Sequence, residues 1–139
     1  MIKKLTLLFT LSVILSASYL REIDGEDGVV LDTKTNLIWQ DSALVEKSWQ
    51  DAITYCEGLE IGIYKDWKLP NYTELYSIVD LSKSLPSQSD VFKEKSLSSY
   101  WTSTIYEPEK IWTIDFTLGS NDFNIVQESE LKVRCVHIR

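Results

Sequence analysis

The chain has a single histidine, His137, in 139 residues, so a catalytic mechanism or metal site that needs several histidines is excluded. One imidazole could act as a general base, but a lone histidine in a C-terminal strand is more often an ordinary strand residue. The sequence also lacks Gly-x-Ser-x-Gly, His-Glu-x-x-His, glycine-rich phosphate-loop and Cys-x-x-Cys motifs. With 21 acidic residues, almost any pair of carboxylates could be selected as a glycosidase pair, so that reading has no specificity. We therefore expect no enzyme, no cofactor and no resident metal.

Basic residues are outnumbered, with 14 Lys and Arg against 21 Asp and Glu and a formal net charge of −7. Removing a leader that contains Lys3 and Lys4 leaves 12 basic against 21 acidic side chains, a net charge of about −9. An acidic surface repels nucleic acid, anionic polysaccharide and anionic lipid headgroups unless its charges are segregated or bridged by cations. We expect no nucleic-acid partner. The acidic excess is explained by solubility or by a cationic partner.

No hydrophobic run is long enough to span a membrane, which needs roughly 20 apolar residues. The run over residues 5–15 is interrupted by threonine and serine, follows two lysines and precedes Ser16, Ala17 and Ser18. This is the arrangement of a secretory signal peptide. We predict that residues 1–18 are a signal peptide rather than a membrane anchor. The mature protein would be periplasmic, secreted or at the cell surface, without membrane association.

Cysteine is scarce, and the two residues present, Cys56 and Cys135, suit a pair. Exported chains with an even and minimal cysteine count usually oxidise them to a disulfide. The bond would close a loop of about 80 residues, which the chain-entropy model values at roughly 4 kcal/mol. A metal or redox pair is the alternative, but metal sites usually need four close ligands and redox pairs are usually Cys-x-x-Cys.

The predicted elements describe one domain over residues 29–139, preceded by a loose polar lead-in at 19–28. Their order is a β-hairpin, two helices, a long loop and an antiparallel β-meander, which is an α+β fold. The hairpin joins residues 29–31 to 37–40. The first helix begins at Ser48, the second covers 72–80, and the loop covers 80–98. The predicted strands of the meander are 99–105, 111–117, 123–127 and 131–138, with a turn at 118–122.

The segment from Asp66 to Leu75 predicts a rigid corner between an extended stretch and the second helix. Pro70 fixes its own φ and pushes the preceding residue into an extended conformation. Asn71 can cap the helix, and Glu74 can reach back to the Asn71 amide as a capping box. Trp67 would anchor the corner in the core.

Aromatic residues are plentiful, and five of them are tryptophans. Trp39, Trp49, Trp67 and Trp112 are interpreted as packing residues, because large aromatics dominate cores. Trp101 lies beside Tyr100 and a Thr-Ser-Thr run and is left open between packing and ligand binding. The candidate ligand-binding residues are Tyr100, Trp101, Tyr106, Glu107, Glu109, Asn121, Asp122 and Asn124.

The oxygen-bearing members of this set could also bind Ca²⁺, which prefers 6–8 oxygen ligands. They lie, however, in two predicted turns at opposite ends of strand 111–117. Seven residues of strand separate such turns by roughly 20 Å, so they cannot share one ion without another loop between them. We therefore interpret them as solvated turns that, with loop 80–98, offer a ligand surface.

Taken together, the motifs resemble a bacterial family named after the C-terminal domain of Legionella collagen-like adhesins, the Lcl C-terminal domain. The resemblance covers about residues 29–138 and departs mildly at Asn36, Lys68 and Thr102, where Gly, Arg and Ser are usual. The matching residues are Asp32-x-x-Thr-Asn-Leu-x-Trp39-Gln40, Trp49-x-x-Ala52 with Tyr55-Cys56, Asp66-Trp-Lys-Leu-Pro-Asn71 with Glu74-Leu75, Tyr100-Trp-Thr-Ser-Thr104, Trp112 with Asp115-Phe116, and Val133-Arg-Cys-Val136.

The resemblance implies an exported, disulfide-bonded domain with a C-type-lectin-like fold, in which an early helix is bridged to the last strand. It also implies adhesion at the cell surface, although the acidic charge disfavours the sulfated polymers associated with the family. We expect a non-enzymatic binding or adhesion-type module whose ligand is a glycan or an extracytoplasmic protein surface. The alternatives are a formylglycine-generating-type enzyme, which shares lectin-like topology, and a structural envelope component. Homo-oligomerisation is left open.

Overall fold

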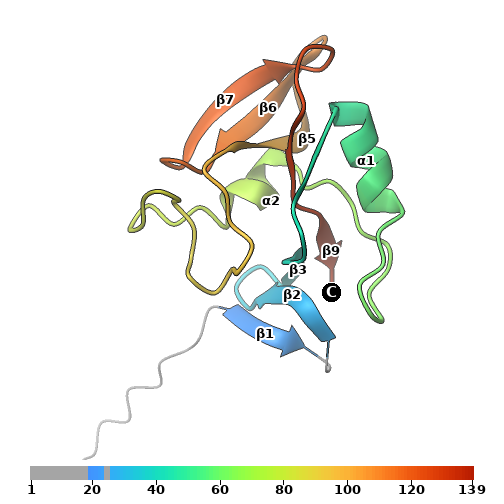
Figure 1. The fold of residues 1–139 in the computed structure, drawn as a ribbon, viewed down its shortest axis with the longest axis vertical. Helices are drawn as coiled ribbons and strands as arrows, with labels where there is room; N and C mark the ends of the chain where they lie inside the picture. Colours follow the sequence, from blue (N-terminus) through green and yellow to red (C-terminus); the bar gives the residue numbers. More distant parts are fainter. Residues whose placement is uncertain (1–18, 24–25) are drawn as a thin grey trace, which may run out of the picture.

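The computed structural model describes residues 19–23 and 26–139, which form two β-sheets and two short helices (Figure 1). The predicted signal peptide, residues 1–18, lies outside the described residues. The strands are β1 (Tyr19–Ile23), β2 (Glu26–Asp32), β3 (Leu37–Gln40), β4 (Val45–Lys47), β5 (Ser99–Glu107), β6 (Lys110–Asp115), β7 (Ser120–Ile125), β8 (Leu131–Val133) and β9 (Val136–Ile138), and the helices are α1 (Trp49–Glu57) and α2 (Tyr72–Tyr76). The α+β class is confirmed.

The first sheet has the strand order β1-β2-β3-β9. The predicted hairpin is confirmed, because β2 and β3 pair antiparallel up to Asp32 opposite Leu37. Asn36 closes the turn at φ 59°, a left-handed conformation that asparagine tolerates, and donates its N–H to the Asp32 carbonyl at 2.8 Å. The expectation of a loose lead-in is wrong for residues 19–23, because β1 pairs antiparallel with β2.

Both helices begin where their caps predict. The Ser48 side chain accepts the Asp51 N–H at the start of α1, and Ala52 and Cys56 of α1 are buried. Helix α2 ends at Tyr76 instead of continuing to residue 80, because Val79 forms an isolated bridge with Gln88. The apolar spacing beyond Tyr76 therefore reflects burial in the core rather than continued helix.

The second sheet has the order β4-β8-β5-β6-β7. Strands β5, β6 and β7 form the predicted meander, but β7 begins at Ser120, so the 118–122 turn is shorter than expected. The predicted strand 131–138 is two strands: β8 pairs antiparallel with β4 and parallel with β5, and β9 joins β3 in the first sheet. The break falls at Arg134 and Cys135, whose buried side chains are held by hydrogen bonds and by the disulfide.

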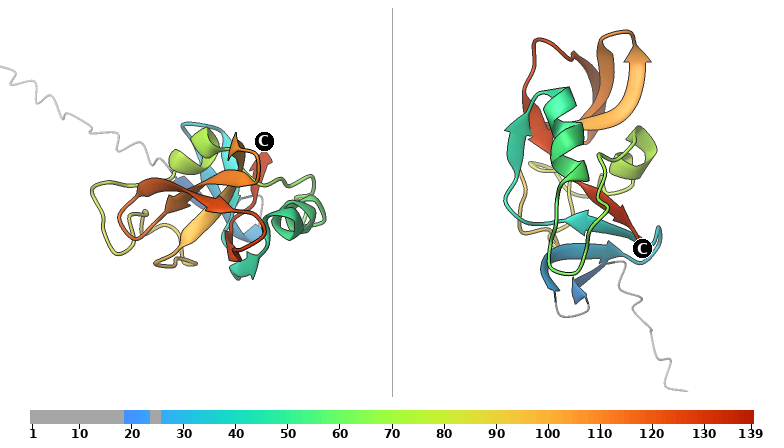
Figure 2. Two further views of the ribbon diagram at one scale, coloured as in Figure 1. Left: turned by 90° about the horizontal axis from the view of Figure 1, so that it is seen from above. Right: turned by 90° about the vertical axis from the view of Figure 1, so that its right-hand side faces the viewer.

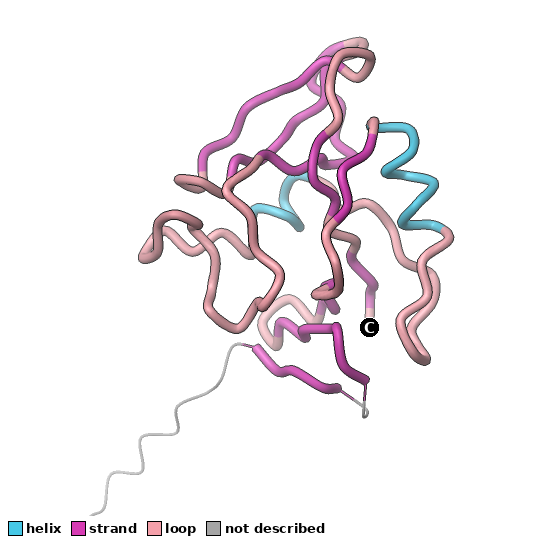
Figure 3. The backbone as a smooth tube through the Cα atoms, in the orientation of Figure 1, coloured by secondary structure: helices cyan, strands magenta, loops and turns pink. Residues whose placement is uncertain are grey.

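The long segment 80–98 has no helix or strand, as predicted, and is drawn as loop in Figure 3. It is nonetheless fixed to the fold, because Ser87, Gln88 and Phe92 are buried. The Ser87 N–H donates to the Phe116 carbonyl at 2.7 Å. The segment is thus only partly the surface loop that its composition indicates.

The core of the described part of the chain consists of two clusters, one containing the buried residues of α1 and the other those of α2. The neighbouring strand β6 contributes to both, with Ile111 in the first cluster and Ile114 in the second. The two helices therefore pack on different sides of the five-stranded sheet, in keeping with their separate positions around the strands in Figure 2. Trp39 and Trp67 are buried at 0% and 2% exposure, which confirms them as packing residues.

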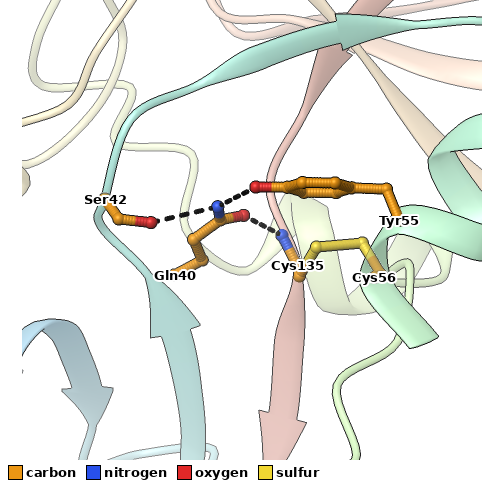
Figure 4. Close-up of a disulfide and its surroundings, with 5 residues drawn as sticks. All are labelled: Gln40, Ser42, Tyr55, Cys56 and Cys135. Carbon is orange, nitrogen blue, oxygen red and sulfur yellow. Dashed lines mark hydrogen bonds between the residues drawn. A yellow bond between two sulfur atoms is a disulfide. The ribbon is translucent and has the colours of Figure 1, made fainter. Parts of the chain in front are cut away.

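Cys56 and Cys135 form a disulfide, which confirms the predicted pair. The bond connects α1 to the segment between β8 and β9, over a sequence separation of 79 residues (Figure 4). Both cysteines are fully buried. The α1 side of the molecule is therefore covalently tied to the point where the chain passes from one sheet to the other.

Candidate binding surface

The corner predicted from residues 66–71 sets the position of α2. Trp67 is buried and donates its indole N–H to the Tyr64 carbonyl at 3.0 Å. Lys68 exchanges two backbone hydrogen bonds with Val136 of β9, each 2.9 Å long. The Pro70 carbonyl then accepts the Ser103 N–H of β5 at 2.8 Å. Because the corner is bonded to both sheets, the helix that follows starts at a fixed place beside β5.

The start of α2 is held by the predicted capping box. The Asn71 side chain accepts the Glu74 N–H at 2.8 Å, and the Glu74 carboxylate accepts the Asn71 N–H at 2.9 Å. Lys68 pairs with the same carboxylate at 3.0 Å, and the Tyr72 N–H donates to the Thr104 hydroxyl of β5 at 2.9 Å. These contacts turn the Tyr72 ring toward the sheet.

A continuous row of five aromatic rings runs from α2 across the meander of β5, β6 and β7. Neighbouring ring centroids are 5.8, 5.6, 4.9 and 4.8 Å apart along the row. The pairs at the two ends are stacked, with interplanar angles of 13° and 14°, and the central contacts are tilted or edge-on. In order, the rings are Tyr76, Tyr72, Trp112, Tyr106 and Phe123.

The row remains open to solvent because α2 has only five residues and covers part of one sheet face. Tyr76, Tyr106 and Phe123 are 39%, 42% and 40% exposed, and Tyr72 and Trp112 are half-buried. Trp112 lies directly opposite Phe123 in the β6–β7 pairing, so both rings stand on one face of the sheet. Strands β5, β6 and β7, which carry Tyr106, Trp112 and Phe123, are labelled near one another in Figure 1.

The row is apolar along its length but carries polar groups at its edges. Within the described part of the chain, the hydroxyls of Tyr72, Tyr76 and Tyr106 make no hydrogen bond to another residue. The Lys110 ammonium lies 5.3 Å from the Phe123 ring centroid and is paired with the Glu107 carboxylate at 3.2 Å. An amphipathic aromatic surface of this kind can stack on a ligand and hydrogen-bond to it at once.

Two of the predicted ligand-binding residues are core residues instead. Tyr100 and Trp101 are both fully buried, because successive residues of β5 point to opposite faces and both faces are covered here. The Trp101 indole donates to the Lys47 carbonyl at 2.9 Å, and the Tyr100 hydroxyl lies 3.2 Å from that of Ser96. Neither side chain can meet a ligand in this structure, so this part of the prediction is corrected.

The remaining predicted residues do not form one site. Strand alternation places Asn121 on the face of Phe123 and Asp122 and Asn124 on the other face, where the Asn124 amide donates to Thr113 at 2.9 Å. Glu107 pairs with Lys110, and Glu109 accepts a hydrogen bond from Gln127 at 3.2 Å. Of the eight predicted residues, Tyr106 is the ring that belongs to the aromatic row.

Residue-by-residue interpretation of the sequence missed Tyr72, Tyr76 and Phe123, and assigned Trp112 to packing alone. A signal was present, because Tyr72 and Tyr76 are four residues apart and share one helix face. What the spacing could not supply is the early end of α2, which leaves the neighbouring sheet face uncovered.

A second feature of the surface is a cavity of about 630 Å³ between the first sheet and the end of α2. Tyr19, Asp32 and Asp80 line it, and Lys34 supplies a cation among these acids. Burial, together with the carboxylates of Asp32 and Asp80, raises the pKa of Tyr19 to about 12. The Tyr19 hydroxyl at this cavity therefore keeps its proton to a higher pH than an ordinary tyrosine does.

The fold and the surface define a class: a disulfide-bonded α+β domain with an exposed aromatic row. Comparison with known families makes the assignment specific, since the Lcl C-terminal domain family matches residues 28–137, and the chain belongs to that family. No curated protein matches the chain. Membership suggests an adhesin-associated domain, and together with the disulfide it indicates a location outside the cytoplasm.

Two further findings concern the described residues alone. None of their helices combines the length and the apolar character that crossing a membrane requires. Nor do residues 19–23 and 26–139 contain a group of three or more His, Cys, Asp or Glu side chains arranged to hold a metal ion.

Proposed function

We propose that this protein is an exported, non-enzymatic binding module of the adhesion type, acting in the periplasm or at the outer surface. The observation that carries the proposal is the row of five contacting aromatic rings, three of them about two-fifths exposed. Tyr and Trp are enriched where proteins meet ligands, because they supply large contact area together with a polar group. The ligand is a glycan or a protein surface.

The two cysteines that an enzyme of the formylglycine-generating type would need, and the single histidine, have structural roles here. Cys56 and Cys135 are joined to each other, so neither is a free thiol. The imidazole of His137 packs against the rings of Tyr64 and Trp67, and its Nδ1 lies 2.6 Å from the Lys65 carbonyl oxygen. These contacts support a non-enzymatic function.

Beyond the α+β class, we propose that the fold has a C-type-lectin-like topology. Its support is the bridge from the first helix to the segment that leads into the last strand, together with the irregular segment 80–98 between helix and meander. A solved structure of this chain compared with lectin-like domains would test it, and a different connection between the two sheets would contradict it.

The function is tested by presenting the purified protein to a glycan array and to extracytoplasmic proteins, each with and without Ca²⁺. The matched variant is Phe123→Ala, which removes one exposed ring from the row. We expect at least one ligand, and we expect Phe123→Ala to weaken its binding while the thermal unfolding midpoint stays close to that of the wild type. No ligand in either assay would contradict the proposal, and a ligand whose binding Phe123→Ala leaves unchanged would contradict the assignment of that binding to the row.

A further inference from the structure

We propose that the aromatic row binds an uncharged oligosaccharide chain without calcium, with a sugar ring stacked at each end of the row. This inference rests on the proposed function as a binding module and adds the class of ligand. The two ends are the stacked pairs Tyr72–Tyr76 and Tyr106–Phe123, and Trp112 contacts both Tyr72 and Tyr106 between them.

The shape of the row fits a chain of sugar rings. A pyranose presents an apolar face of C–H groups and a rim of hydroxyls. The row presents aromatic surface with three tyrosine hydroxyls at its edge, and those hydroxyls are not engaged by other described residues. In such an arrangement the aromatic faces stack on the sugar C–H face and the tyrosine hydroxyls hydrogen-bond to the sugar hydroxyls, because Tyr is apolar in its body and polar at its tip.

The exposed area favours a saccharide over a protein partner. Tyr76, Tyr106 and Phe123 are 39–42% exposed. With roughly 200 Å² for each aromatic side chain, the three rings offer on the order of 250 Å². A stable protein interface needs about 800 Å² from each partner, whereas a patch of a few hundred Å² is typical of a small functional site.

The charge around the row favours a neutral ligand. Lys110, beside the Phe123 ring, is already paired with Glu107 at 3.2 Å, and Lys68 is paired with Glu74 of α2 at 3.0 Å. The full sequence has a net charge of −7, so a sulfated or carboxylated polymer would approach an unfavourable field. Calcium has no place in the contact, because the carboxylates of Glu107 and Glu109 are turned to Lys110 and Gln127.

The experiment measures binding by titration calorimetry against three uncharged series, the cello-, manno- and fully N-acetylated chito-oligosaccharides, with heparin and polygalacturonate as anionic probes. EDTA and salt are varied for each probe. We expect one of the neutral series to bind with an affinity that neither EDTA nor salt changes, since screening acts on charged partners only.

Variants at the two ends of the row locate the contact. Tyr76→Ala and Tyr106→Ala should each weaken binding about tenfold, the range of one lost ring–ring stack. Tyr106→Phe keeps the ring and should retain most of the affinity. Ile138→Ala, at an apolar side chain that is 62% exposed in β9 of the other sheet, is the matched control and should change nothing. Unfolding midpoints of all variants show that the fold is kept.

The outcomes separate this inference from the proposed function. Binding of heparin or polygalacturonate but of no neutral series would overturn the inference. If the domain instead captures a protein and no saccharide, and if Tyr76→Ala and Tyr106→Ala abolish that capture, the inference is overturned and the proposed function stands. Saccharide binding that all row variants leave unchanged would overturn the assigned site, and no binding of any probe or protein would overturn both.

Discussion

Gln40 and Cys135 are joined by two hydrogen bonds that use the backbone and the side chain of the same glutamine. The Gln40 N–H donates to the Cys135 carbonyl at 3.0 Å, and the Cys135 N–H donates to the Gln40 side-chain oxygen at 3.0 Å. The amide nitrogen of Gln40 reaches on to Tyr55 of α1 at 2.9 Å and to Ser42 at 3.1 Å (Figure 4). One buried amide therefore ties β3 and α1 to the chain beside the disulfide.

Gln40→Ala should lower the free energy of unfolding by about 2 kcal/mol, because the buried Cys135 N–H and the Tyr55 hydroxyl lose their partner. Urea denaturation followed by tryptophan fluorescence measures the loss. Ser42→Ala is the control: it removes one of these bonds at a half-buried side chain and should cost less than half as much. Equal losses in the two variants would show that the Gln40 amide is not central.

Reduction of the disulfide should destabilise the protein by roughly 4 kcal/mol, since the bond closes a loop with a separation of 79 residues. The urea midpoint with and without reductant checks this. The double variant C56A/C135A should match the reduced wild type and should not respond to reductant. A wild-type midpoint that reductant leaves unchanged would contradict the expectation.

Asp41→Asn should cost about 3 kcal/mol, because the Asp41 carboxylate lies between Arg21 and the fully buried Arg134. The carboxylate also accepts the N–H groups of Lys93 and Glu94, each at 3.0 Å, so the loss should loosen segment 80–98 as well. Chemical denaturation gives the stability, and hydrogen exchange gives the local opening.

The matched control for this ion-pair network is Asp27→Asn. The Asp27 side chain is 72% exposed and lies 3.7 Å from Arg21, so its loss should cost less than about 1 kcal/mol. If Asp41→Asn were as mild as this exposed variant, the buried network would contribute little to stability.

Gly119→Ala should destabilise the domain by about 1–3 kcal/mol, the usual effect of overpacking. Gly119 has φ +72°, and an added Cβ would lie 2.7 Å from the Val79 Cγ1 and 3.0 Å from the Leu81 Cδ2. Gly58→Ala is the control, because that glycine has φ −93° and its nearest contact would be 3.6 Å. It should be neutral or slightly stabilising, and thermal unfolding of both variants distinguishes the two sites.

Stability should fall as the pH rises from 10 toward 12, in part because of Tyr19. Burial and the carboxylates of Asp32 and Asp80 raise the pKa of Tyr19 from 10.0 to about 12, so the unfolded state loses this proton first. The contribution is complete below pH 10 and is lost as the pH passes through 12.

Tyr19→Phe provides the comparison for this pH dependence, because phenylalanine cannot ionise. Over this pH interval, the free energy of unfolding of the wild type should fall relative to that of Tyr19→Phe. A difference that stays constant would place the Tyr19 pKa at its ordinary value.

Local features of the sequence were predicted well because they depend on neighbours along the chain. The Asn71–Glu74 capping box, the Ser48 cap and the hairpin turn at Asn36 all form as expected. The assignment of Tyr100 and Trp101 as ligand-binding residues is wrong, because the position of a strand within its sheet decides burial on both faces. The same limit applies to segment 131–138, whose apolar pattern does not show that it divides between two sheets.

The sequence by itself determined the family, the α+β class, the pairing of Cys56 with Cys135 and the acidic charge that argues against anionic ligands. The tertiary structure decided which aromatic side chains face solvent. Tyr72 and Trp112 are 40 residues apart in sequence, and their rings meet only because the corner at Pro70 is bonded to β5 and α2 ends after five residues. A surface built from contacts between distant segments has no local pattern, since each residue's neighbours are set by the packing of the whole chain.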